Sequence, residues 1–317
     1  MKRTILSGVA AASLLVGVGH AATFVVFGDS TVDAGAAQAA ALANGFPNPT
    51  PAELGYFQGR FSNGLNTADY VNQVLNGTPT TNFLAGGTNY AFGGATVVTD
   101  LGQGPGGNPV GIPDLADQVD LFLASGPVAA DTDVFLSVGG NDFLAAARGV
   151  GDPSDIGMAA LADLTAQLRR LAEAGATNVG VSNVNASGFA LGGATELAAA
   201  VEAYNDALAA ALIELSASTG ARFALVDRDA VFDRIVADPL AFGFDPALLG
   251  QACVAEPAAV PDCDGYVLFD PIHTTTRAQA LVADEVLAAL RGAEVPLPAA
   301  VWLFLGGAVV FRAARRA

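Results

Sequence analysis

Short apolar runs alternate with helix-like patterns along most of the chain. Four of these runs lie at residues 24–27, 134–138, 179–181 and 223–226, and the first two end directly before a glycine. Almost every residue in them is apolar, which is typical of strands that are buried on both faces of a parallel sheet. The sequence therefore predicts four buried strands.

The segments between these runs have the periodicity of amphipathic helices. Four leucines between residues 161 and 171 recur at intervals of three or four, and a second apolar stripe extends over residues 197–215. We expect residues 274–290 to form the final helix. Strand–helix alternation predicts a three-layer α/β/α sandwich with a central, mostly parallel sheet, and ligands of such folds bind at the carboxyl ends of the strands.

Two segments, residues 36–58 and 100–115, are rich in Ala, Gly and Pro and have no clear period. We expect both to be long surface loops near the site, where they would set specificity. No internal repeat or linker interrupts residues 23–294, which we interpret as one α/β domain.

The first 22 residues have the pattern of a secretory leader. Lys2 and Arg3 are followed by an apolar run over residues 5–18 and then by small residues. An uncleaved membrane anchor is the alternative, but the run is short of the roughly 20 residues that a span needs. We therefore predict that residues 1–22 are a signal peptide and that the protein is exported to the periplasm, the cell surface or the medium.

Residues 295–317 form a tail in three parts: Val-Pro-Leu-Pro-Ala at its start, an apolar run to Phe311, and a basic end. This tail resembles the bacterial sorting signals of the PEP-CTERM type, in the variant that opens with those five residues. The resemblance implies recognition by an exosortase-like membrane protease and release or attachment at the cell surface. A plain C-terminal transmembrane anchor is the alternative.

The region between these ends is strongly acidic. Residues 23–294 hold nine basic and 31 acidic residues, which leaves a net charge of −22. A field of this size disfavours nucleic acids and anionic membrane surfaces as partners. It fits a soluble exported protein, which we expect to be a monomer.

Two cysteines, Cys253 and Cys263, are separated by nine residues. In an oxidising compartment we expect them to form a disulfide that pins the loop ahead of Asp270. Two cysteines and one histidine make poor material for a structural zinc site, so we expect no bound metal.

Candidate chemistry lies where the predicted strands end. Gly-Asp-Ser at residues 28–30 follows the first strand, and Ser30 would project its hydroxyl from the sheet edge with a helix N-terminus behind it. Gly93 and Gly94 would let the backbone approach a ligand, and Asn141 offers an amide donor after the second strand. Taken singly, a helix cap, a glycine turn and an Asx turn explain these features equally well.

His273 is the only histidine in residues 23–294, and Asp270 precedes it by three residues on a short loop. Alone, this pair is an ordinary helix start. A carboxylate, an imidazole and a serine at one sheet edge are together what a serine hydrolase needs. One shared function explains all four features better than four separate coincidences.

With these residues in place, the chain resembles the GDSL family of esterases and lipases, also called SGNH hydrolases, over nearly all of residues 24–290. The segments that match the family's blocks are residues 27–35, 59–64 (Gly-Arg-Phe-Ser-Asn-Gly), 89–95, 139–142 and 270–273.

The resemblance implies a flavodoxin-like SGNH fold and an ester hydrolase that needs no metal or organic cofactor. It implies that Ser30 attacks the ester carbonyl after His273 removes its proton, and that Asp270 orients the imidazole. The backbone N–H groups of Ser30 and Gly94, with the Asn141 side chain, would form an oxyanion hole.

The sequence departs from the family at two places. Residues 183–191 lack the proline-rich exit that many relatives have after this strand, and Thr274 stands where the family usually has proline. Neither departure involves an expected catalytic residue, so we expect both to affect loop shape and substrate fit rather than the chemistry.

Two classes of function compete. The first is an exported hydrolase of a lipid, a short acyl ester or an acetyl group on a surface polysaccharide, and the tail favours the polysaccharide. The second is a surface or matrix-binding protein on the same fold with little turnover, since a fold does not fix a function. The complete set of site residues argues for the enzyme. A nucleotide-dependent oxidoreductase is disfavoured because no Gly-x-Gly-x-x-Gly follows the first strand.

Overall fold

A parallel sheet runs through the centre of the molecule, a computed structural model that describes residues 23–99, 101, 111–191 and 195–292. The sheet has the order β1-β2-β3-β4 and consists of four strands: β1 (Thr23–Gly28), β2 (Thr132–Ser137), β3 (Asn178–Ser182) and β4 (Arg222–Val226). All neighbouring strands pair in parallel, with Gly28 opposite Ser137 at the carboxyl edge. The four strands predicted from apolar runs are confirmed.

Nine α-helices and five short 3₁₀ helices surround the sheet in the described part of the chain. The α-helices are α1 (Ala36–Ala43), α2 (Thr67–Asn76), α3 (Leu115–Leu123), α4 (Gly140–Ala147), α5 (Pro153–Glu173), α6 (Ala186–Leu191), α7 (Thr195–Thr219), α8 (Arg228–Ala237) and α9 (Thr276–Leu290). The 3₁₀ helices are η1 (Ala52–Leu54), η2 (Phe83–Ala85), η4 (Pro239–Phe242), η5 (Pro246–Leu248) and η6 (Cys253–Ala255). Within the described residues, none of the helices combines the length and apolar character that a membrane span requires.

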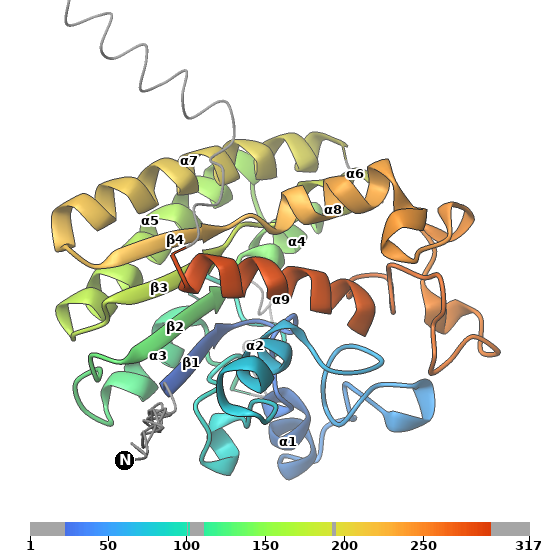
Figure 1. Cartoon of the computed structure of the whole chain (residues 1–317), viewed down its shortest axis with the longest axis horizontal. Helices are drawn as coiled ribbons and strands as arrows, with labels where there is room; N and C mark the ends of the chain where they lie inside the picture. Colours follow the sequence, from blue (N-terminus) through green and yellow to red (C-terminus); the bar gives the residue numbers. More distant parts are fainter. Residues whose placement is uncertain (1–22, 100, 102–110, 192–194, 293–317) are drawn as a thin grey trace, which may run out of the picture.

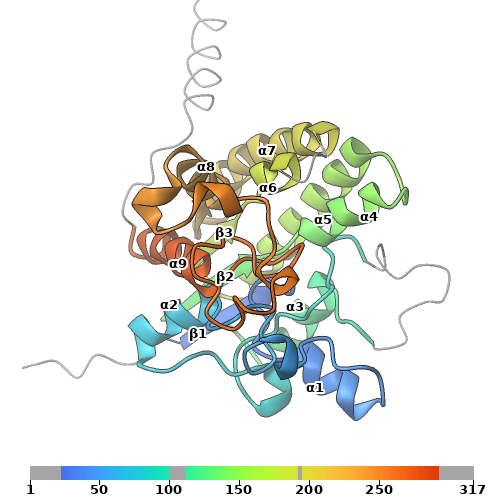
Figure 2. The same ribbon diagram turned by 90° about the vertical axis from the view of Figure 1, so that its right-hand side faces the viewer.

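The helices cover both faces of the sheet, as the predicted three-layer sandwich requires. Helices α2 and α9 lie in front of the sheet in Figure 1, and α3, α5 and α7 lie behind it. The view turned by 90° in Figure 2 shows the sheet between these two layers. The carboxyl ends of the strands, where the predicted site residues follow, lie on the right in Figure 1 and therefore face the viewer in Figure 2.

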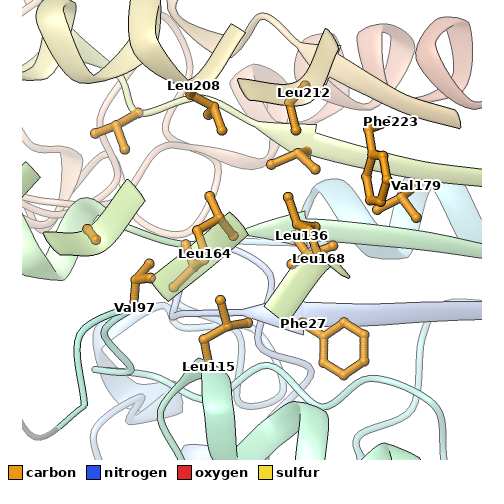
Figure 3. Packing of buried hydrophobic residues seen from close by; sticks show 14 of the residues in the cluster. Phe27, Val97, Leu115, Leu136, Leu164, Leu168, Val179, Leu208, Leu212 and Phe223 are labelled. Carbon is orange, nitrogen blue, oxygen red and sulfur yellow. The ribbon is translucent and has the colours of Figure 1, made fainter. Parts of the chain in front are cut away.

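Alternate residues of each strand fill two separate cores. Val25 and Phe27 of β1 pack toward α3, α5 and α7, whereas Phe24 and Val26 pack toward α2 and α9. Figure 3 shows the first of these cores, in which leucines of α5 and α7 meet the sheet. Burial on both faces explains why the strands read as continuous apolar runs.

The outer edge of β1 is paired by an irregular segment instead of a fifth strand. Val26 donates its backbone N–H to the carbonyl of Thr88, and Tyr90 donates to the carbonyl of Val26. Within the described residues, the segment forms only one bridge to β1, between Asn89 and Val26. Further along, Phe92 donates to the carbonyl of Gly28. These bonds carry residues 92–95 to the carboxyl end of β1.

The prediction that residues 36–58 form one long loop is wrong in its first part, because residues 36–43 form α1. Alanine has the highest helix propensity, but a nearly uniform alanine run has no apolar period that would indicate a helix. Asp33 accepts hydrogen bonds from the N–H groups of Gly35, Ala36 and Ala37 and so starts this helix. The predicted loop 100–115 is described only at 101 and from 111, and α3 begins at Leu115.

The final helix begins at Thr276, two residues later than predicted. Thr274 pairs with Leu268 in an antiparallel bridge, and Thr275 has an extended backbone. The predicted signals at residues 1–22 and 295–317 lie outside the described residues.

Candidate active site

Three predicted site residues form one line of hydrogen bonds at the carboxyl edge of the sheet. His273 Nε2 lies 2.8 Å from Ser30 Oγ, and His273 Nδ1 lies 2.7 Å from Asp270 Oδ2. All three are buried, with 9% of Ser30, 8% of His273 and 5% of Asp270 exposed. Ser30 is separated from His273 by 243 positions in the sequence, so the fold alone brings them together.

Asp270 accepts four hydrogen bonds from the residues that the structure describes. Its Oδ1 takes the backbone N–H groups of Ile272, at 2.8 Å, and His273, at 2.7 Å. Its Oδ2 takes the imidazole Nδ1 and also the hydroxyl of Tyr56, at 2.9 Å. Burial raises the pKa of Asp270, but its interactions with His273 and Ile272 outweigh that effect and hold the pKa below its ordinary value. This carboxyl is therefore an anion at neutral pH.

Ser30 sits in a tight turn that begins where β1 ends. A side chain at Gly28 would collide with the carbonyl of Ser137 on the neighbouring strand, so glycine allows β1 and β2 to approach here. Asp29 donates its backbone N–H to the same carbonyl, and its side chain accepts from the backbone and hydroxyl of Thr31. Burial raises the pKa of Asp29, although these bonds and nearby Arg228 oppose the shift. The turn is thus fixed from within.

The expectation of a helix N-terminus directly behind Ser30 is wrong. Helix α1 begins six residues later, at Ala36, and Asp33 rather than Asp29 or Ser30 caps it. Asp33 also accepts the N–H of Gly93, at 2.9 Å, and so ties the serine turn to the glycine segment. Burial raises the pKa of Asp33 to about 6, against four backbone hydrogen bonds that lower it.

The predicted oxyanion donors belong to three segments: the turn after β1, the glycine segment and the first turn of α4. Gly94 has a backbone φ of 92°, a conformation that favours glycine. Within the described residues, neither the N–H of Ser30 nor that of Gly94 donates a hydrogen bond to another protein group. Asn141 gives one amide hydrogen to the carbonyl of Ala95, at 2.8 Å, and no described residue accepts its second amide hydrogen. Three donors thus remain for a ligand.

Asp142 ties the first turn of α4, which carries Asn141, to the chain that follows the glycine segment. Its two carboxylate oxygens accept the N–H groups of Val97 and Val98, each at 2.9 Å. Burial raises the pKa of Asp142 to about 7, while these two bonds lower it and nearby Asp114 adds to the rise. Because Asp142 is adjacent to Asn141, this contact helps to set where the amide points.

The segment at residues 59–64, matched above only as a family block, supports the histidine loop. Phe61 packs against the imidazole, with ring centroids 5.0 Å apart. Ser62 donates its hydroxyl to the carbonyl of Thr274, and Asn63 accepts the N–H of Thr276, both at 2.9 Å. These contacts hold the residues that directly follow His273 in the chain.

The predicted disulfide between Cys253 and Cys263 is confirmed. Both cysteines lie in a buried cluster with Tyr266 and Phe269, the residue directly before Asp270. The disulfide therefore restrains the loop from which the carboxylate projects. In the described part of the chain, no group of three or more His, Cys, Asp or Glu side chains is arranged to hold a metal ion.

Sequence reasoning missed Tyr56, which lies 214 residues from the carboxylate that it contacts. It belongs to the segment that was expected to be a specificity loop, and no periodic or motif signal marks it. Its role could be seen only once the loops were folded against each other.

The comparisons with known proteins agree with this geometry. The chain matches the family model described as GDSL-like Lipase/Acylhydrolase over residues 24–286. Among curated proteins it is similar to GDSL esterase/lipase LTL1 of Arabidopsis thaliana, with 27% identity over 83% of this chain and 86% of that protein. GDSL esterase/lipase At4g16230 of the same plant is also 27% identical, over 83% and 85%.

Two solved structures align over most of the chain at low identity. One is an extracellular lipase from Streptomyces rimosus, with 18% identity, a TM-score of 0.39, and coverage of 84% of this chain and 99% of that one. The other is phospholipase A1 from Streptomyces albidoflavus NA297, with 16% identity, a TM-score of 0.39, and coverage of 86% and 100%. Because the family model spans most of the sequence, the chain belongs to the GDSL-like lipase/acylhydrolase family and is a carboxylic-ester hydrolase.

Proposed function

We propose that the protein is an exported serine esterase that works through Ser30, His273 and Asp270. The observation that carries this proposal is the unbroken line of contacts from Ser30 Oγ to the imidazole, at 2.8 Å, and from the imidazole to an ionised carboxylate, at 2.7 Å. Serine, base and orienting acid within hydrogen-bond distance are the arrangement that activates a hydroxyl as nucleophile.

In this proposal the proton transfers follow the two hydrogen bonds of His273. Ser30 Oγ attacks the ester carbonyl as its proton moves to His273 Nε2, and the carbonyl oxygen becomes an oxyanion. The oxyanion then collapses, the C–O bond to the alcohol breaks, and the leaving alkoxide takes the proton from Nε2. Water hydrolyses the acyl-serine by the same route in reverse, with His273 again as the base. Asp270 keeps Nδ1 protonated throughout and stabilises the imidazolium.

The oxyanion hole in this proposal consists of the backbone N–H groups of Ser30 and Gly94 and the Asn141 amide. The support is that all three retain an unused donor within the described residues. Such donors act mainly on the charge that develops in the transition state, so each is expected to raise kcat more than it lowers KM.

The proposed substrate is a lipid, a short acyl ester or an acetyl group on a surface polysaccharide. An apolar acyl part is supported by Ile272, which lies between Asp270 and His273 and exposes 52% of its surface. The names of the curated relatives, esterase/lipase, agree with it. The polysaccharide option rests on the tail at residues 295–317, which resembles a sorting signal of matrix-associated proteins.

Export, processing of the tail by an exosortase-like protease, and a monomeric state complete the proposal. The leader-like residues 1–22 and the tail support the first two. Intact-mass measurement of the protein recovered from the medium or envelope of the producing cell is the test. A mass equal to that of the full chain would contradict both cleavages.

The enzymatic test compares the purified full chain with Ser30→Ala on p-nitrophenyl acetate, butyrate and palmitate, and on acetylated exopolysaccharide. Turnover that disappears in the variant supports the proposal, and the chain-length profile identifies the acyl group. Absence of turnover on every substrate, together with no labelling of Ser30 by a fluorophosphonate, would favour the matrix-binding alternative.

A further inference from the structure

Among the described residues, one donor outside its own loop forms a hydrogen bond with the carboxylate of Asp270. Three of its four donors belong to residues 272 and 273, whereas the fourth is the hydroxyl of Tyr56, 2.9 Å from Oδ2. The same oxygen accepts the imidazole Nδ1 at 2.7 Å. Tyr56 and His273 therefore share one acceptor atom, and each affects the strength of the other's bond.

Tyr56 acts here as a donor. Burial raises the pKa of its hydroxyl, and the neighbouring charge of Asp270 raises it further, so the phenol stays protonated over the working range of an esterase. An ionised carboxylate can only accept, which fixes the direction of the bond. A donated proton on Oδ2 reduces the negative charge that this oxygen presents to the imidazole.

The ring of Tyr56 is held by contacts with residues around the site. It meets Phe269 edge to face, with centroids 4.8 Å apart, and Phe61 in the same way at 6.5 Å. Phe61 in turn packs on the imidazole of His273. The aromatic rings thus link the two hydrogen-bonding partners of Oδ2 by packing as well.

The loop that carries Tyr56 is pressed against the disulfide loop. A side chain at Gly55 would collide with Val260, which lies between Cys253 and Cys263. Tyr56 and Val260 both pack against the buried cluster that contains the disulfide. The hydroxyl is therefore presented from a covalently restrained support, which is the condition for a group that must hold another in place.

We propose that Tyr56 is a positioning residue of the catalytic centre, which orients Oδ2 of Asp270 and sets the pH at which His273 becomes an effective base. This inference rests on the proposed roles of Ser30, His273 and Asp270. Without the Tyr56 hydroxyl, Oδ2 presents more negative charge to the imidazole and stabilises its protonated form. The acidic limb of the rate profile then moves to higher pH, because the base must be neutral to accept the proton of Ser30.

The other ionisable groups that act on this pair remain unchanged when only the Tyr56 hydroxyl is removed. Asp29, in the serine turn, interacts electrostatically with His273. Arg228, in α8, interacts with Asp29, and burial lowers the pKa of its guanidinium. Neither forms a hydrogen bond with Tyr56 or Asp270 in the described structure, so a shift of the limb reports the Tyr56 bond.

The test compares Tyr56→Phe with Tyr70→Phe in the full chain. Tyr70 is a matched control because its hydroxyl also makes one partly buried hydrogen bond, 2.8 Å from Thr276 Oγ1, but does not touch Asp270 or His273. Two rates are followed from pH 5 to 9: kcat/KM on p-nitrophenyl acetate, and fluorophosphonate labelling of Ser30, which needs no ester turnover. Thermal unfolding of each variant is measured beside them.

For Tyr56→Phe we expect an acidic limb about half to one pH unit above that of the wild type in both profiles. At pH 7 we expect roughly a tenfold fall in kcat with little change in KM, since the lost bond had a charged acceptor and does not face the substrate. Tyr70→Phe should retain the wild-type limb.

A limb of Tyr56→Phe that superimposes on those of the wild type and Tyr70→Phe overturns the inference, even if the variant is less stable, because a purely structural role changes stability alone. Normal labelling without any ester hydrolysis would defeat the proposed function, while the labelling profile would still decide the role of Tyr56. A wild-type chain that neither labels nor hydrolyses overturns both.

Discussion

Replacing Asp270 by asparagine should disable the enzyme by trapping the wrong form of the imidazole. The side-chain oxygen of the asparagine is best placed at the position of Oδ1. There it still accepts the hydrogen bonds from the N–H groups of Ile272 and His273, which are 2.8 and 2.7 Å long in the wild type. The amide nitrogen then occupies the position of Oδ2 and offers only N–H donors to His273 Nδ1. His273 must accept there, so its proton moves to Nε2, which can no longer take the proton of Ser30.

The opposite orientation of the asparagine amide is less stable. It restores an acceptor for Nδ1 but places the NH₂ group against the two backbone N–H donors of residues 272 and 273. Leaving a buried donor such as the N–H of His273 unpaired costs about 1–3 kcal/mol, and the partly buried N–H of Ile272 would lose its partner as well. The first orientation leaves only the Tyr56 hydroxyl to find a new acceptor. The tautomer that cannot act as a base is therefore the stable one.

The expected loss in kcat/KM is about 10³- to 10⁴-fold, equivalent to roughly 4–5.5 kcal/mol in the activation free energy. The assay is hydrolysis of p-nitrophenyl acetate at pH 8 by the wild type, Asp270→Asn and Ser30→Ala, with the last as the floor. Circular dichroism and thermal unfolding establish that the variant is folded. If the folded Asp270→Asn variant keeps a kcat/KM within tenfold of the wild type, the reasoning is refuted, because the loss of a carboxylate that holds the imidazole tautomer should lower the rate much more.

Three further changes test the surrounding structure. Asn141→Ala should lower kcat about 10²- to 10³-fold with a small change in KM, because it removes an oxyanion donor, and steady-state kinetics will measure this. Asp142→Asn should be about 4 kcal/mol more destabilising at pH 4 than at pH 8, as measured by urea unfolding. The folded pKa of Asp142, about 7, exceeds its ordinary value of 3.8, so the stability that this carboxyl contributes is lost as the pH rises from 4 to 7. The neutral amide of the variant makes no such pH-dependent contribution. Replacing Cys253 and Cys263 by serine should lower the free energy of unfolding by about 2–3 kcal/mol, through the entropy of a ten-residue loop, in the same assay.

Each of these three predictions has a result that would contradict it. An Asn141→Ala enzyme that changes KM but not kcat would place the amide in substrate binding instead of transition-state stabilisation. A pH-independent difference between Asp142→Asn and the wild type would show that the pKa of this carboxyl is the same in the folded and unfolded states. A disulfide-free variant as stable as the wild type would show that packing alone holds the 253–263 loop.

The sequence by itself determined the layers of the fold and the candidate residues of the centre. Strands buried on both faces must be apolar throughout, and helices between them must keep an apolar stripe, so local composition was enough to predict β1 to β4, α5 and α7. Ser30 and His273 could be proposed because packing alone rarely places a polar group at the end of a buried strand or a unique histidine beside an acid. The cysteine pair was predictable from its short spacing.

Only the tertiary structure decided how these residues are supported. Helix α1 was missed because uniform alanine carries no period, and its start depends on Asp33, which also reaches Gly93 from sixty positions away. Tyr56 could not be identified because its partner is 214 residues distant and its segment has no pattern of its own. Periodicity records what a residue's own element buries, whereas a hydrogen bond between two irregular loops leaves no trace in either, and exists only once folding has brought the loops together.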